Sequence, residues 1–256
     1  MRGEGGEDII MYIDEYEGLK AVRYRTVREI RRDGSVRERK TAVPAEHSMT
    51  IYVNGREVME VVCTGQYLAE LILGRLLTAG IIKNADEVEA VCVGEAGEAG
   101  LAVLRSREAP AEEAEVFEKL PAKPAVWKEE WVFALADRFA EGMPIHQETF
   151  AVHSCFLSMK GEILFECEDI GRHNAFDKVI GYALRNQIDL KQCIVYLSGR
   201  VPADMAEKAV RAGIPVLAAK AAATYEAVQF AKEHGLTLIC PARRDQLLTY
   251  DPFGTR

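Results

Sequence analysis

The sequence CIVYLSGRVPADMAEKAVRAGIPVLAA, residues 193–219, decides the fold class. It begins as a continuous apolar run, passes through Ser198-Gly199-Arg200, continues into a helix opened by Pro202, and returns to a second apolar run. Short apolar runs that alternate with helical stretches are typical of a parallel sheet with right-handed helical crossovers. We therefore predict an α/β layer in this part of the chain.

The same alternation extends outward from residues 193–219. Upstream, the pattern predicts a helix over Glu129 to Glu141 and a hairpin that turns at Lys160-Gly161, and downstream it continues to about Cys240. Between residues 108 and 128 the composition shifts to Ala, Pro and Glu, which opposes any long regular element. We place a domain boundary there, with a small strand-rich α+β domain over 1–120 and the α/β domain over 121–256.

The N-terminal part predicts strands around one helix. Apolar and polar residues alternate up to Val62, with hairpin turns expected at Asp33-Gly34 and Asn54-Gly55. Apolar residues then recur at helical spacing over 67–77 and end before Gly80, so a helix should pack on those strands. A further strand pair, 87–93 and 101–105, is expected on either side of a glycine-rich loop.

Composition and charge exclude several classes of protein. With 256 residues, 48% hydrophobic and 28% charged, the chain is globular rather than disordered. Its net charge of −8 gives no global attraction to nucleic acid or to an anionic membrane. The most apolar stretch, Val61 to Ile82, is interrupted by Gln66, Glu70 and Arg75, so we expect no transmembrane helix.

The expected compartment is the cytoplasm. The first ten residues carry three acidic side chains where a secretory signal needs basic residues and a long apolar run. The six cysteines are too few for a disulfide scaffold in a chain of this length. Most of them, including Cys63, Cys92 and Cys193, lie in apolar strand-like runs, so we predict reduced thiols that are mostly in the core.

The densest polar cluster, residues 168–178, lies where a strand ends and a helix begins. Its candidate ligand-binding residues are Asp169, Arg172, His173, Asn174 and Lys178. A helix N-terminus with nearby cations is suited to a phosphate or pyrophosphate, so the cluster predicts an anion site. The alternative is an ordinary capped helix whose charges pair in solvent.

A second candidate site is the turn Ser198-Gly199-Arg200. In open α/β sheets ligands bind at the carboxyl ends of strands, where a glycine lets backbone approach the ligand and the next helix offers its N–H groups. Ser198 and Arg200 are therefore candidate phosphate or ribose contacts, although such a turn can also be a simple connection.

His153 and Cys155 form a candidate catalytic pair. They lie two apart on a predicted strand and so point to the same face, where they could form a thiolate–imidazole pair. The alternative is that both belong to the core. Cys167 lies on the returning strand. A three-residue turn from Lys160 to Glu162 would set Cys167 directly opposite Cys155. A two-residue turn would put Cys167 on the other face of the hairpin.

Two other sequence features are weaker indications of function. His146-Gln147-Glu148 matches half of a zinc deaminase motif, but no P-C-x-x-C follows, so we expect no zinc. The basic segment from Arg23 to Lys40 could contact a partner, but alternating arginines along a hairpin are usually its solvated face.

Several motifs together resemble one known family. They are VPAEHSMTIYVNG at 43–55, the segment from Cys63-Thr64 to Ile82, EDIGRHNAFDKVIG at 168–181, SGR followed by DMAEKAVRAGIPVLAAK at 204–220, and LTLICPARRDQLLTY at 236–250. In order and spacing they resemble the FdhD family of formate dehydrogenase accessory sulfurtransferases. The resemblance extends from about Pro44 to Tyr250.

The resemblance implies a fold, a function and further site residues. The fold would be a small N-terminal domain plus a cytidine-deaminase-like three-layer α/β domain without zinc. Such proteins receive sulfur from a cysteine desulfurase and pass it to the Mo-bis-molybdopterin guanine dinucleotide cofactor before it enters the formate dehydrogenase catalytic subunit. The two anion sites would hold that cofactor's phosphates, with a guanine nucleotide as a fragment. The C-terminal segment that would also contact it here comprises Pro241, Ala242, Arg243, Arg244, Asp245 and Gln246. A homodimer is an open alternative to a monomer.

One departure from the family concerns sulfur. The family carries sulfur as a persulfide on a C-x-x-C pair ahead of the helix expected at Glu129, and residues 118–131 here contain no cysteine. If sulfur transfer is retained, Cys155 with His153 as its base is the leading candidate, and Cys167 is the second. The alternative is a non-catalytic chaperone that binds the cofactor, and a zinc deaminase is a distant third.

Overall fold

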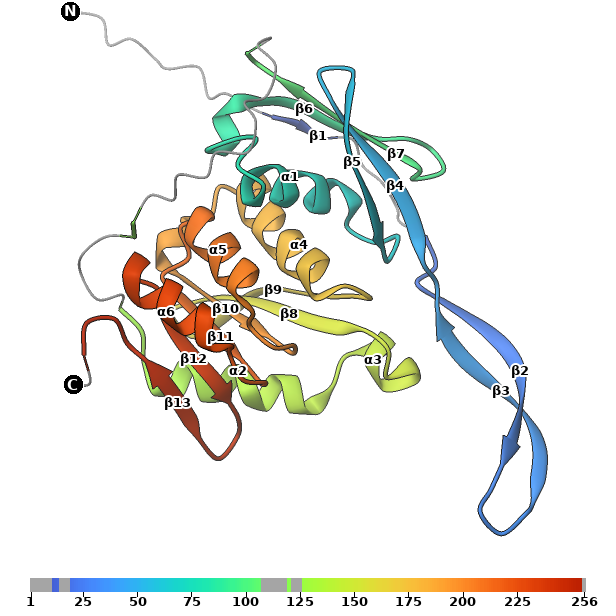
Figure 1. The fold of residues 1–256 in the computed structure, drawn as a ribbon. Helices are drawn as coiled ribbons and strands as arrows, with labels where there is room; N and C mark the ends of the chain where they lie inside the picture. The colour runs from blue at the N-terminus through green and yellow to red at the C-terminus, as the bar shows by residue number, and fades with distance from the viewer. Residues whose placement is uncertain (1–10, 14–18, 107–118, 121–125, 255–256) are drawn as a thin grey trace, which may run out of the picture.

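The computed structural model describes residues 11–13, 19–106, 119–120 and 126–254. Its described strands form a five-stranded sheet, a six-stranded sheet and a two-stranded ribbon. The five-stranded sheet and the ribbon come from the N-terminal part, and the six-stranded sheet with most helices comes from the C-terminal part (Figure 1). The predicted mixture of α+β and α/β structure is confirmed.

The five-stranded sheet contains most of the first motif of the family resemblance, from His47 onward. Its order is β1-β6-β7-β4-β5, with bounds β1 Tyr12–Ile13, β4 His47–Val53, β5 Arg56–Cys63, β6 Val88–Val93 and β7 Ala99–Leu104. Asn54 and Gly55 both have positive φ, as a tight hairpin turn requires, and they join β4 to β5 as predicted. The antiparallel pair β6 and β7 is also confirmed.

Strands β2 (Val22–Ile30) and β3 (Val36–Pro44) form a ribbon that projects away from the body (Figure 1). In the described structure they pair only with each other, over nine residue pairs from Val22↔Pro44 to Ile30↔Val36. The predicted turn at Asp33-Gly34 lies at the tip, where Gly34 has φ 83°. We call residues 22–44 the arm.

Helix α1 (Leu68–Thr78) lies between the five-stranded sheet and α4 (Arg172–Arg185) (Figure 1). It was expected to pack on the N-terminal strands. It does contact β6 and β7, but it packs more extensively against α4. Two glycines permit this approach, because a Cβ on Gly74 would lie 1.8 Å from the Asp177 carbonyl oxygen and one on Gly181 would lie 1.8 Å from that of Glu70. The two helices therefore meet backbone to backbone.

The six-stranded sheet has the order β13-β12-β11-β10-β8-β9. The bounds are β8 His153–Met159, β9 Glu162–Asp169, β10 Cys193–Leu197, β11 Val216–Ala219, β12 Thr237–Ala242 and β13 Leu247–Tyr250. Strands β10, β11 and β12 are parallel to one another, whereas β8, β9 and β13 are antiparallel to their neighbours. The predicted parallel layer is therefore correct for the centre of the sheet.

Helices cover both faces of the six-stranded sheet (Figure 1). On one face lie α4, α5 (Ala203–Arg211) and α6 (Tyr225–His234), and on the other lies α2 (Glu129–Glu141), followed by the short α3 (Pro144–Thr149). Residue alternation explains this, since Leu157 and Leu197 join the core beneath α4 whereas Phe156 and Tyr196 join the core against α2. The three-layer arrangement follows from strands that are apolar on both faces.

One hydrophobic core runs through both halves of the chain. It contains Ile51 and Leu71 from the N-terminal half together with Phe176 and Val195 from the C-terminal half. The boundary at residue 120 stays a prediction. Among the described residues, no helix is long and apolar enough to cross a membrane.

Candidate functional site

One edge of the six-stranded sheet collects most of the predicted site residues. The parallel strands β10, β11 and β12 end there with Leu197, Ala219 and Ala242. Because β8 is antiparallel to β10, its first residue His153 lies at the same edge, and β9 returns to it with Asp169 opposite His153. The turn 198–200 and the N-terminus of α4 therefore project from one edge, as ligand sites of open α/β sheets do.

The two predicted clusters meet at Gly199. A Cβ on Gly199 would lie 3.2 Å from Cδ of Arg172 and 3.3 Å from Nδ1 of His153. The Ser198 hydroxyl accepts a hydrogen bond from the Ser154 N–H at 3.0 Å and lies 3.2 Å from His153 Nδ1. Gly199 thus lets the 198–200 turn, the start of β8 and the start of α4 pack together.

Two arginines supply the positive charge at this edge. Arg200 is exposed, whereas Nε of Arg172 is buried and has no hydrogen-bond partner among the described residues. Neither guanidinium forms an ion pair within the described part of the chain. Guanidinium donors beside a helix N-terminus are chemically suited to an anion.

The histidines at this edge contribute as neutral groups. Burial lowers the pKa of His153 below its ordinary value, and the neighbouring Arg172 lowers it further. Burial also lowers the pKa of His173, whose Nε2 lies 3.4 Å from Oδ2 of Asp204. A ligand at neutral pH would therefore meet hydrogen-bonding imidazoles and cationic guanidiniums.

Three predicted ligand-binding residues are engaged elsewhere. Asp169 and Lys178 are fully buried and form an ion pair, with Nζ 2.6 Å from Oδ2. Lys178 also donates to the Thr64 hydroxyl at 2.8 Å and to the Thr64 carbonyl at 3.1 Å. The Asn174 amide donates to the Val62 carbonyl at 2.7 Å. The prediction that these side chains contact a ligand is not supported, because each is satisfied by the N-terminal half of the chain.

A second buried ion cluster lies one turn along α4. Oδ2 of Asp177 lies 2.9 Å from Nε of Arg75 on α1 and 2.7 Å from Nζ of Lys208 on α5. The Thr78 hydroxyl donates to Oδ1 of the same carboxylate at 2.8 Å. The polar residues of the 168–178 motif therefore tie three helices together. Of the five predicted binding residues, Arg172 and His173 are the two that form no polar contact with the N-terminal half among the described residues.

The predicted C-terminal contact segment forms the turn between β12 and β13. Ala242 is buried, and its carbonyl accepts a hydrogen bond from the Tyr196 hydroxyl at 2.9 Å. Pro241 precedes it within β12. Arg244 extends toward α2, where its Nε lies 2.7 Å from Oδ1 of Asp137. The side chains of Arg243, Asp245 and Gln246 are exposed.

The two candidate thiols face each other across the β8–β9 hairpin. The turn at Lys160-Gly161 has two residues, which alone would put the thiols on opposite faces. A bulge between Leu157 and Ser158 shifts the register by one residue, so Cys155 pairs with Cys167. Sequence reasoning did not anticipate this bulge.

Neither candidate thiol is placed for nucleophilic chemistry. Both are buried, with Cys155 0% and Cys167 1% exposed. Burial raises the pKa of Cys167 to about 12 and raises that of Cys155 well above its ordinary value. In the described structure no hydrogen bond joins His153 to Cys155. The expected role of Cys155 as a sulfur carrier therefore has no support from its position.

Cys92 differs from the other cysteines. It was expected to be embedded in a strand core, but it is partly exposed on β6, whereas the other five are buried. Its neighbour across the sheet is Leu101 on β7, which is also exposed. The alternation along β6 put Cys92 on the outer face, a feature visible in the sequence but not used.

Comparison with known proteins identifies the family. The family model described as FdhD/NarQ matches residues 44–254. The chain belongs to the FdhD/NarQ family. The sulfur carrier protein FdhD of Listeria monocytogenes serotype 4b is 28% identical over 243 residues, covering 86% of this chain and 93% of its own length. Protein FdhD of Methanocaldococcus jannaschii is 28% identical over 216 residues, covering 81% and 87%.

A solved structure extends the likeness to the fold. The crystal structure of a formate dehydrogenase accessory protein from Desulfotalea psychrophila superposes with a TM-score of 0.81 at 25% identity, covering 90% of this chain and 97% of that one. The FdhD/NarQ match contains every residue of the sheet edge described above, whereas nearly all of the arm precedes it.

Two contributors to the FdhD site region were missed from the sequence. Lys220 follows β11 at the sheet edge and is exposed, with Nζ 4.9 Å from the ring centroid of Phe139. The rule that selected residues 198–200, a polar residue directly after a buried strand, would have found it. No local sequence pattern around Thr64 indicates that it contacts Lys178. Among the described residues, no group of three or more His, Cys, Asp or Glu side chains could hold a metal ion.

Proposed function

We propose that this chain is an accessory protein for formate dehydrogenase maturation that binds a molybdenum cofactor carrying guanine dinucleotide at the edge of the six-stranded sheet. The names of its FdhD relatives and of its structural neighbour support the link to formate dehydrogenase. The observation that supports this ligand class is the pair Arg172 and Arg200 beside Gly199, which form no ion pair with any described residue. Phosphates suit such a pair because guanidiniums bind them through paired hydrogen bonds.

The positions of the cysteine thiols favour a version of this function in which the chain binds the cofactor but carries no sulfur. All six cysteines are described; five are buried, and residues 118–131 contain none. Burial raises the pKa of Cys63, Cys193 and Cys240 to about 12, as it does for Cys167. A persulfide carrier needs a thiolate that both donor and acceptor can reach. In this form the partner is the formate dehydrogenase catalytic subunit, in the cytoplasm.

Sulfur transfer is the second candidate function. It is favoured by the relatives named sulfur carrier protein FdhD. It would add a cysteine desulfurase as a partner. It would require either that a buried thiol such as Cys155 becomes accessible or that the partly exposed Cys92 carries the sulfur.

Calorimetry with GDP, used as a cofactor fragment, tests the ligand site. Arg172→Ala and Arg200→Ala should each weaken binding by roughly 1.5 to 3 kcal/mol, the value of a hydrogen bond to a charged group. Arg56→Ala, at the exposed start of β5, removes the same charge from the other sheet and should leave GDP binding unchanged. Wild-type affinity in both site variants would refute the placement.

Mass spectrometry after incubation with a cysteine desulfurase and cysteine separates the two functions. We expect no sulfur adduct on any peptide, together with normal formate dehydrogenase activity in cells that carry Cys155→Ala. A persulfide on Cys155, with activity lost in the variant, would favour sulfur transfer instead.

A further inference from the structure

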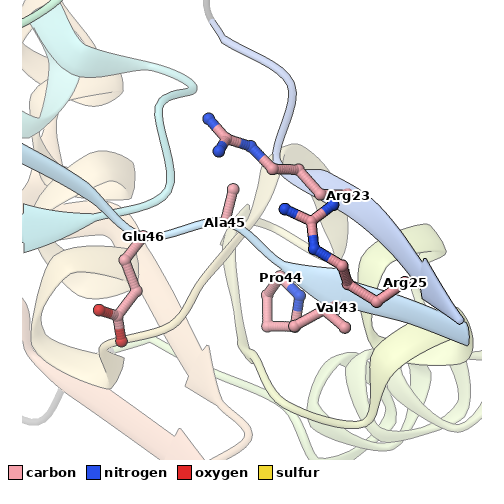
Figure 2. Close-up of a pocket in the computed structure, with 6 residues that line it drawn as sticks. All are labelled: Arg23, Arg25, Val43, Pro44, Ala45 and Glu46. Atoms are coloured by element: carbon pink, nitrogen blue, oxygen red, sulfur yellow. The ribbon is translucent and has the colours of Figure 1, made fainter. Parts of the chain in front are cut away.

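The arm meets the body at a cavity that no part of the proposed function uses. The cavity has a volume of about 290 Å³ and is lined by Arg23, Arg25, Val43, Pro44, Ala45 and Glu46. Figure 2 shows the Arg23 and Arg25 guanidinium groups extending in the same direction from β2, with Pro44 and Ala45 beneath them. The root of the arm thus combines two cations and one carboxylate, Glu46, with an apolar floor.

Alternation along the strands explains why these two arginines act together. Arg23 and Arg25 are two apart on β2 and share one face of the arm with their cross-strand partners Val43 and Thr41. Arg28 and Lys40 lie on the opposite face, since Arg28 is an odd number of residues from Arg25 and Lys40 pairs with Thr26.

The charges of Arg23 and Arg25 are not neutralised. Within the described residues neither forms an ion pair, and Arg25 donates only to the carbonyl of Tyr24 at 3.0 Å. Farther out, Glu29 faces Arg39 at 3.6 Å and also pairs with Arg37. Acidic residues therefore pair with arginines of the outer arm, whereas the two guanidiniums at its root form no ion pair with any described residue, including Glu46 of the same cavity.

The arm differs from the rest of the chain in its net charge. Residues 22–44 contain eight Lys or Arg and three Asp or Glu, a net charge of +5 in a chain whose total is −8. Seven of the eight cations are arginine, the side chain that binds carboxylates through two parallel hydrogen bonds. The complementary ligand is therefore acidic.

The strands of the arm also offer backbone groups. In the described structure β2 and β3 pair with no other strand, so each keeps one edge without a strand partner. Part of the arm also contacts α3, where the Tyr24 hydroxyl donates to Glu148 at 2.8 Å. An unpaired edge accepts a further extended strand through main-chain hydrogen bonds. A two-stranded ribbon with almost no core of its own is also marginal in isolation.

We propose that the root of the arm binds an acidic, extended polypeptide segment of a partner protein. Its carboxylates pair with Arg23 and Arg25, its apolar side chains lie on Val43 and Pro44, and its backbone adds to a free edge of the arm. A polypeptide is favoured over nucleic acid because the floor is apolar and the remaining chain, net negative, repels a long polyanion.

The test uses a fluorescein-labelled peptide of alternating Glu and Val, six residues long, with the full chain at an ionic strength of about 0.15 M, where the Debye length is about 8 Å. Fluorescence anisotropy should show saturable binding that Arg23→Ser/Arg25→Ser weakens by about tenfold or more, as expected for two lost charge-assisted contacts. The matched control, Arg28→Ser/Lys40→Ser, removes the same charge from the other face and should change binding less than about threefold, since distant charges are screened. Circular dichroism checks that both variants keep the fold.

Three results would overturn the proposal. Equal weakening by both double variants would mean that only the arm's net charge attracts the peptide. Duplex DNA binding as tightly as the peptide would make nucleic acid the better ligand. Inorganic phosphate competing at a concentration similar to that of free peptide would reduce the site to a small-anion contact. None of these outcomes depends on GDP binding at the sheet edge, so this proposal and the proposed function can fail separately.

Discussion

Lys178 on α4 and Asp169 at the end of β9 form an ion pair from which water is excluded, with 2.6 Å between Nζ and Oδ2. The Thr64 N–H donates to the same carboxylate oxygen at 3.0 Å, so the pair also holds the segment between β5 and α1. The most polar motif in the sequence therefore joins the two halves of the protein. Of its predicted binding residues, only Arg172 and His173 form no polar contact with the N-terminal half among the described residues.

Replacing Lys178 should destabilise the fold rather than weaken ligand binding alone. Lys178→Met leaves the Asp169 carboxylate buried without its cation, which costs about 3 to 5 kcal/mol of unfolding free energy. Urea denaturation measures this loss. Lys191→Met, at an exposed position, serves as the control and should change stability by less than about 0.5 kcal/mol. A Lys178 variant as stable as the control would contradict the structural role.

Adding a methyl group between α1 and α4 should force these helices apart. In Gly74→Ala or Gly181→Ala the new Cβ would lie 1.8 Å from a backbone carbonyl oxygen, which no side-chain adjustment relieves. Each variant should lose at least about 3 kcal/mol, the upper range for overpacked cores. At Gly94, where the nearest atom to a new Cβ is 3.5 Å away, the same substitution should be tolerated. Thermal unfolding of the three variants decides this.

Alkylation of the native protein should select Cys92. The other five thiols are buried, and a pKa of about 12, as for Cys167 and Cys240, leaves a thiolate fraction of about 10⁻⁴ at pH 8. Peptide mapping after brief treatment with iodoacetamide at pH 8 should find the label on Cys92, and Cys92→Ser should abolish the fast phase. Rapid labelling of Cys155 would instead reveal an opening that the static structure lacks.

Acidification should destabilise the protein through His153 and His173. Burial lowers the pKa of both imidazoles in the folded state, so the unfolded chain binds more protons as the pH falls below about 6.5. The urea midpoint should therefore decrease from pH 7.5 to 5.5. Glu168 acts in the opposite direction at lower pH, because burial raises its pKa.

A double variant isolates the contribution of the two histidines. His153→Gln/His173→Gln should flatten the dependence of the urea midpoint between pH 7.5 and 5.5. The wild type and the variant should behave alike between pH 7.5 and 8.5, where neither imidazole takes up protons. An unchanged slope in the variant below pH 7 would assign the effect to other groups.

Sequence reasoning located the elements well wherever the signal was local. The helix expected over residues 129–141 has those bounds as α2, and the turns at Asn54-Gly55 and Lys160-Gly161 are where their residue types placed them. These predictions depend only on periodicity and on backbone conformations that few residues adopt.

The roles of side chains were harder to predict where distant segments meet. A lysine beside a helix N-terminus suits a phosphate, and nothing near Lys178 indicates that Thr64, 114 residues earlier, occupies its amine. The register of the β8–β9 hairpin depends on a bulge at Leu157 and Ser158, and the residue types of the turn do not indicate that bulge. The arm was correctly expected to be a hairpin, but its separation from both larger sheets is a tertiary outcome.

The backbone contact between α1 and α4 also sets an order of events during synthesis. Helix α1 ends at Thr78 and α4 begins at Arg172, so the ribosome must add nearly a hundred residues before the second helix exists. At about 5 to 20 residues per second, the nascent chain waits roughly 5 to 20 s with one side of α1 uncovered. A chain that stalls or is cleaved in this interval exposes the apolar face of α1 that α4 would cover. Chaperones bind surfaces of this kind.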